Sequence, residues 1–86
     1  MPRKLTAAER IERARELIQE ARELPVPADT GKFDLTYMAK VKDLLQEARD
    51  LVKFISYRPG ISPEKKAEAA NILTEADEAQ KEILRS

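Results

Sequence analysis

Residues 38–55 read Met-Ala-Lys-Val-Lys-Asp-Leu-Leu-Gln-Glu-Ala-Arg-Asp-Leu-Val-Lys-Phe-Ile. Apolar residues recur in this stretch at alternating spacings of three and four, at positions 38, 41, 45, 48, 52 and 55. This spacing keeps one side of an α-helix apolar, so that side must face other helices. Tyr37, Leu44 and Leu51 widen the apolar side until it can contact two neighbours. The pattern therefore predicts a central helix over about residues 35–56.

The same spacing appears in two further stretches. It places Ile, Ala, Ile and Ala at 11, 14, 18 and 21, and Ala, Ile, Ala, Ala and Ile at 69, 72, 76, 79 and 83. These patterns predict helices over about residues 7–24 and 63–84. Connections this short make successive helices antiparallel. We therefore expect residues 1–86 to form a single all-α domain, an antiparallel up-down-up three-helix bundle.

Capping residues and prolines mark the helix boundaries. Thr6, followed by Glu9 three residues later, forms the capping-box pattern of a helix start. Pro25 ends the first helix because it lacks an amide hydrogen. Asp34 is the expected cap of the central helix, and Ser62, followed by proline, is the expected cap of the third.

Two connections join the helices. Residues 25–34 form the longer one, and Val26 and Phe33 are its large apolar residues, which we expect to cover the end of the core. Pro59 and Gly60 suit the central positions of a tight turn in the shorter connection. The alanines of the first and third helices either let the backbones approach closely or leave a shallow groove for a partner helix.

The charge balance argues against a nucleic-acid partner. Sixteen basic and sixteen acidic residues give a net charge of zero and are spread evenly, whereas a nucleic-acid-binding protein carries a clustered positive field. The longest apolar runs are pairs of residues, so we expect no membrane-spanning segment. Residues 1–5 lack the apolar run of a signal peptide. The sequence does not indicate a cellular compartment.

Residue types suited to catalysis are scarce. The chain has no histidine or cysteine, so its serines and threonines lack a histidine base, and thiolate metal sites are excluded. Acidic pairs four residues apart fall on sides that the pattern assigns to solvent, at Asp43/Glu47, Glu64/Glu68 and Glu78/Glu82. We therefore predict no enzyme activity and no catalytic, cofactor-binding or metal-ligating residues.

Four residues remain as candidates for binding a partner. Phe33 and Tyr37 lie at the start of the central helix, and Tyr57 and Arg58 lie at its end. Tyrosine and arginine are enriched among the residues that dominate binding energy at protein interfaces. The alternative is that the aromatic residues cover the two ends of the bundle, which leaves Tyr57 and Arg58 as the more exposed pair.

In style the whole chain resembles computationally designed helical bundles. The helices consist mainly of Glu, Lys, Arg, Ala and Leu, the charges balance, and the helix starts carry the caps Thr6-x-x-Glu9 and Ser62-Pro63. The connection over residues 25–31 is longer and less regular than the loops of such designs. This resemblance implies a scaffold made to fold stably, with no natural biochemical activity.

A looser resemblance is to microtubule-interacting-and-trafficking domains, which are three-helix bundles that bind helical peptides. Asp29-Thr-Gly31-Lys-Phe33 is similar to their entry into the second helix, with the glycine displaced by one position. Glu75-Ala76-Asp77-Glu78 is similar to a run late in their third helix. This resemblance implies the alternative function, a small helical module that docks a partner peptide or helix, and it assigns no binding residue here.

We therefore expect a designed or engineered helical scaffold with no natural biochemical activity, and the alternative is the small protein-binding module. Neither requires a cofactor. We expect a monomer with no obligatory partner, because the two proline-containing turns favour closure of the bundle within one chain. A homodimer is the alternative, since the apolar faces could also pack across chains.

Overall fold

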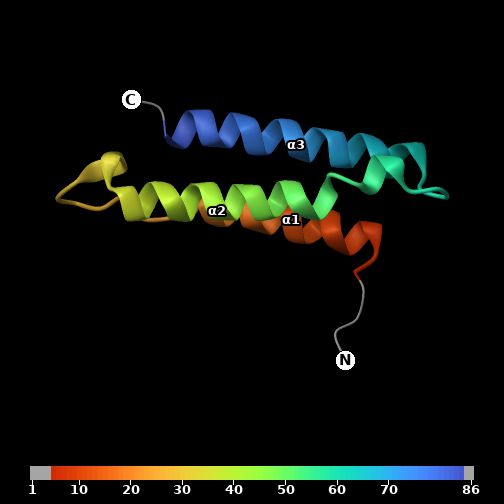
Figure 1. Ribbon diagram of the computed structural model, residues 1–86, viewed down its shortest axis with the longest axis horizontal. Helices are drawn as coiled ribbons and strands as arrows, with labels where there is room; N and C mark the ends of the chain where they lie inside the picture. Colours follow the sequence, from red (N-terminus) through yellow and green to blue (C-terminus); the bar gives the residue numbers. More distant parts are fainter. Residues whose placement is uncertain (1–4, 85–86) are drawn as a thin grey trace.

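The computed structural model describes residues 5–84, apart from the side chain of Lys32, and those residues form helices without any strand (Figure 1). In chain order the elements are α1 (Ala7–Glu23), the 3₁₀ turn η1 (Gly31–Phe33), α2 (Leu35–Val52), the 3₁₀ turn η2 (Ile55–Tyr57) and α3 (Pro63–Ile83). Successive helices run in opposite directions, and each packs against both others. The predicted antiparallel up-down-up three-helix bundle is confirmed.

Two expectations reach beyond these residues. The predicted domain includes residues 1–4 and 85–86, and the expectation about a signal peptide concerns the same first residues. Residues 1–4 and 85–86 lie outside the described part of the chain. Within the described part, no helix has the length and apolar character needed to cross a bilayer.

The core occupies the line where the three apolar faces meet. Every buried side chain among the described residues is apolar or aromatic: Ile11, Ala14, Leu17, Ile18, Ala21, Tyr37, Val41, Leu45, Ala48, Val52, Ile55, Ala69, Ile72, Ala76 and Ala79. The predicted spacing accounts for nearly all of them, although Met38 and Ile83 are only partly buried. The alanines on the apolar sides of α1 and α3 are fully covered, so they allow close approach of the helices rather than leave a groove for a partner; they are Ala14, Ala21, Ala69, Ala76 and Ala79.

The helices begin at the predicted caps. Thr6 Oγ1 accepts a hydrogen bond from the Glu9 amide at 3.1 Å, and Glu9 Oε1 accepts one from the Thr6 amide at 3.0 Å, which completes the capping box. Asp34 and Ser62 likewise accept the amide three residues ahead, at 3.0 and 3.3 Å. Side-chain acceptors at these positions satisfy amides that have no partner inside the helix.

The predicted end of the central helix at residue 56 is wrong. The last α-type bond runs from the Lys53 amide to the Arg49 carbonyl, and α2 ends at Val52. The following bonds span three residues, from Tyr57 to Phe54 at 3.1 Å and from Arg58 to Ile55 at 3.2 Å. The chain therefore tightens into a 3₁₀ turn before it reaches Pro59. Ile55 is buried nevertheless, since a 3₁₀ turn also places residues three apart on one side.

Positive φ angles occur at the two glycines, Gly31 (63°) and Gly60 (80°). Both reverse the chain direction in the connections, where residues with a side chain are strained. The turn chemistry inferred for residues 59 and 60 therefore agrees with the structure.

Candidate functional site

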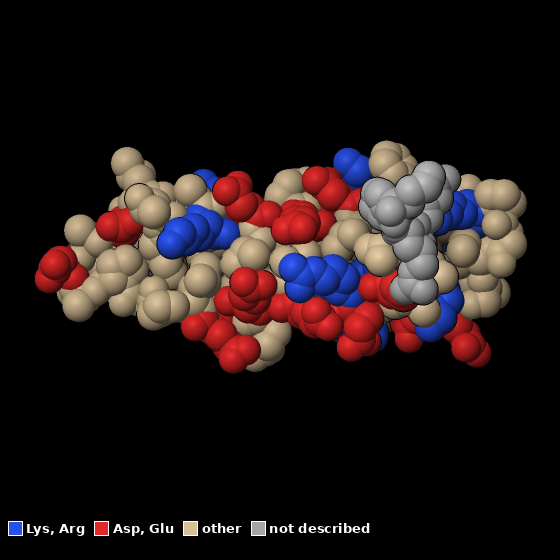
Figure 2. Space-filling view, turned by 90° about the horizontal axis from the view of Figure 1, so that it is seen from below, with Lys and Arg blue, Asp and Glu red and all other residues tan. Residues whose placement is uncertain are grey.

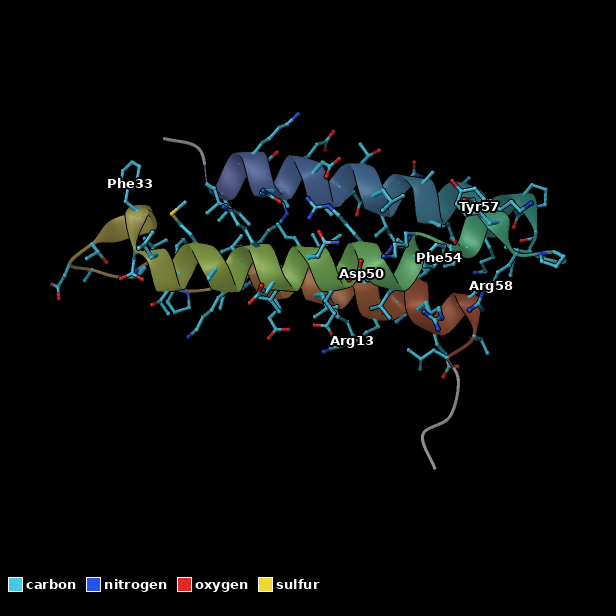
Figure 3. The ribbon with its side chains drawn as sticks, in the orientation of Figure 1. Arg13, Phe33, Asp50, Phe54, Tyr57 and Arg58 are labelled. Carbon is cyan, nitrogen blue, oxygen red and sulfur yellow. The ribbon has the colours of Figure 1, made fainter. Side chains whose placement is uncertain are left out.

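The four candidate residues do not form one site. Phe33 lies at one end of the bundle, whereas Tyr57 and Arg58 lie at the other (Figure 3). Tyr37 is 6 % exposed and belongs to the core, so it offers no surface to a partner. Its burial follows from helical spacing, because Tyr37 and Val41 lie on the same side of α2.

The end of the bundle near Phe33 carries exposed apolar side chains. Val26, Phe33 and Leu35 are 54, 68 and 82 % exposed. The expectation that Val26 and Phe33 cover the end of the core is therefore wrong. At this end the buried Tyr37 lines a small hollow together with Leu24 and Pro25, and Val26 and Phe33 lie outside the core. Leu35 was missed in the sequence because the first residue of a helix has no fixed place in the apolar pattern.

At the opposite end, the turn after α2 exposes two aromatic side chains. Phe54 is 60 % and Tyr57 80 % exposed, and Arg58 follows directly. We call Phe54, Tyr57 and Arg58 the aromatic turn. A 3₁₀ turn has three residues per turn, so Phe54 and Tyr57 share one side while Ile55 points to the core. The structure therefore exposes two aromatic side chains at the same turn.

A lysine lies over one of these rings. Lys53 Nζ is 5.1 Å from the centroid of Phe54, a distance at which the ring face attracts a cation. The same ammonium group pairs with Asp50 Oδ1 at 3.1 Å. Hydrogen bonds from Lys53 and then Gln46 lower the pKa of Asp50. Asp50 therefore stays charged and holds Lys53 beside the turn.

A shallow groove with polar groups lies between α2 and α3. Its lining residues are Met38, Lys42, Arg49, Asp77, Gln80, Lys81 and Leu84. Arg49, which is mostly buried, reaches Asp77 Oδ1 at 2.9 Å and Gln80 Oε1 at 2.9 Å. These contacts join α2 to α3, so they serve the packing of the bundle.

The carboxylates lie on the outside of the bundle. Figure 2 shows acidic side chains mixed with basic ones over α1 and the adjoining side of α2. On α1 the exposed glutamates recur at helical spacing, at Glu12, Glu16, Glu20 and Glu23. Within the described residues, no three acidic side chains are grouped as ligands for a metal ion. The face in Figure 2 is therefore an ordinary solvated surface of mixed charge.

Three of the hydroxyl side chains form hydrogen bonds with the backbone. Thr6 and Ser62 cap helices, and the Thr74 hydroxyl donates to the Ala70 carbonyl at 3.3 Å. Asp34 is a cap whose pKa is lowered by the Tyr37 amide and by the Thr30 hydroxyl, at 3.0 and 2.8 Å. These contacts explain the polar residues of the loops without a reaction.

Comparison of the chain with protein-family models, with curated protein sequences and with solved structures gives no match.

Proposed function

We propose that this chain is a small protein-binding module without enzymatic activity, and that the aromatic turn is its contact site. The observation that carries the proposal is the pair Phe54 and Tyr57, both largely exposed on one side of η2. Aromatic side chains bury a large area at little conformational cost, and tyrosine and arginine dominate binding energies at interfaces. Ile55 supplies the core contact of this turn, and neither ring is part of the buried core.

A rigid base supports the turn. Ile55 within the turn and Val52 just before it are almost fully buried, and η2 packs against α3. A partner that covers Phe54 and Tyr57 would therefore bury apolar surface without first ordering the backbone. Pre-organisation of this kind lowers the entropic cost of association.

Selection from a phage-displayed library of random peptides tests the proposal. The library is panned on the wild-type protein and counter-selected on the double variant Phe54→Ser and Tyr57→Ser. We expect peptides that bind wild type and lose binding to the double variant. The control variant Leu35→Ser, at the other end of the bundle, should keep them. Peptides that bind all three proteins equally would refute the aromatic turn as the site, and so would the absence of any selected binder.

The second candidate is a designed scaffold with no natural activity. It is supported by the agreement of caps, turns and apolar pattern along the described chain, in which no polar or charged residue is buried. It accounts less well for Phe33, Leu35 and Phe54, because designed surfaces carry few exposed large apolar residues. The panning experiment separates the two candidates, since a scaffold should yield no peptide sensitive to the double variant.

The proposal treats the chain as a monomer. One chain suffices to bury the faces of all three helices, so the core needs no second copy. Sedimentation at two concentrations checks this, because a dimer held by the exposed ends should dissociate on dilution.

A further inference from the structure

The sequence around the aromatic turn contains basic residues but no acidic residue. Residues 51–63 contain Lys53 and Arg58 but no aspartate or glutamate, in a chain with sixteen acidic residues. The nearest acidic residues in sequence are Asp50 and Glu64. Asp50 is already engaged by Lys53 and Gln46. Because Lys53 is paired with Asp50, the charge that the turn itself leaves unpaired is that of Arg58.

Arg58 is the cation of the turn that is available to a partner. Its side chain is exposed and makes no hydrogen bond or ion pair with any residue from 5 to 84. Lys53, by contrast, is held between Asp50 and the ring of Phe54. A guanidinium group offers paired N–H donors that match the two oxygens of a carboxylate. An unpaired arginine beside exposed aromatic rings thus suits a ligand that is both acidic and apolar.

We infer that the aromatic turn binds an acidic peptide segment, with a carboxylate of the peptide on Arg58 and an apolar side chain across Phe54 and Tyr57. This inference rests on the proposed function and adds the chemistry of the partner. A peptide fits better than an extended polyanion. Nucleic acids are held by many phosphate contacts, and stable membrane anchoring needs more apolar insertion or a larger basic cluster than two cations supply.

Amide NMR titration tests the inference with three defined peptides. The first is a short peptide of leucine and glutamate, the second has glutamine in place of each glutamate, and the third has lysine there. We expect the glutamate peptide to shift the amides of residues 53–61. It should bind about fivefold more tightly than the glutamine peptide, an upper value for an exposed charge pair, and the lysine peptide should bind least. Added salt should reduce the difference.

Variants assign the effect to its residues. Arg58→Gln should remove the preference for glutamate but keep the weaker binding of the glutamine peptide. Arg13→Gln removes an exposed arginine from the middle of α1, remote from the turn (Figure 3), and should leave the preference unchanged. Circular dichroism of both variants checks that the bundle is intact.

The outcomes separate the inference from the proposed function. Equal binding of the glutamate and glutamine peptides at the turn overturns the inference and leaves the protein-binding module standing. Shifts confined to other residues, or none with any peptide, overturn both. Vesicles containing phosphatidylserine are the remaining probe. If the vesicles shift the amide resonances of residues 53–61 while the glutamate peptide does not, the site binds lipid surfaces and the peptide inference is wrong.

Discussion

The Nη1 atom of Arg10 lies 3.4 Å from the carbonyl oxygen of Leu51 and donates a hydrogen bond to it, which ties the start of α1 to the last turn of α2. The carbonyl belongs to the last turn of a helix, where no backbone amide follows to satisfy it. The aromatic turn begins three residues later. Arg10 therefore helps to hold the end of α2 at the place where the chain changes to η2.

Replacement of Arg10 by methionine should loosen this end of the bundle. Methionine keeps an apolar stem against the core but cannot donate to Leu51. The Nε atom of Arg10 is buried without a partner, and its removal offsets part of the loss. We expect the free energy of unfolding to fall by less than about 1 kcal/mol. The amides of Tyr57 and Arg58 should nevertheless exchange faster in hydrogen-exchange NMR. Unchanged exchange at both amides would show that Arg10 does not support the turn.

Leu45→Ala should be among the most damaging core substitutions. Leu45 is fully buried in the middle of α2, where both neighbouring helices limit collapse of the space. We expect a loss of roughly 2–5 kcal/mol in urea denaturation. The control Gln46→Ala changes the adjacent exposed residue and should stay within about 0.5 kcal/mol of wild type. Similar midpoints for the two variants would contradict the core assigned here.

Ala76→Leu tests the close approach of α3. Ala76 is completely buried, so a larger side chain must displace its neighbours. We expect destabilisation by about 1–3 kcal/mol through overpacking. Ala70→Leu makes the same change on the exposed side of α3 and should be nearly neutral. A neutral or stabilising effect of Ala76→Leu in thermal melts would mean that the helices are farther apart than the structure shows.

The ionisation of Asp34 should make the free energy of unfolding depend on pH in the acidic range. Hydrogen bonds from the Tyr37 amide and the Thr30 hydroxyl lower its pKa in the folded state. A carboxyl group with a lowered pKa stabilises the fold above its unfolded value and loses that contribution as the pH falls below about 4. Urea midpoints measured across this range should therefore fall less steeply for Asp34→Asn, which can still accept the amide. If the urea midpoints of wild type and Asp34→Asn fall in parallel as the pH is lowered, Asp34 is not a cause of the acid dependence.

The sequence by itself determined the bundle and most of its boundaries. The three-and-four spacing assigned Val41, Leu45 and Ile72 to a shared core, because apolar area must leave water and only a helix places those positions on one side. The caps followed from local hydrogen bonding between a side chain and an amide three residues away, as at Asp34. Such short-range chemistry is readable without coordinates.

Only the tertiary structure decided which aromatic residues are accessible. The sequence grouped Phe33 with Tyr37 and Tyr57 with Arg58, but the periodic pattern does not govern loops and helix ends. The folded chain buries Tyr37 and leaves Phe33 outside. It also replaces the last turn of α2 by η2, where Phe54 and Tyr57 are both exposed. Exposure at each end depends on how the three helices pack against one another there. Those contacts join residues far apart in the sequence, so no local segment determines them.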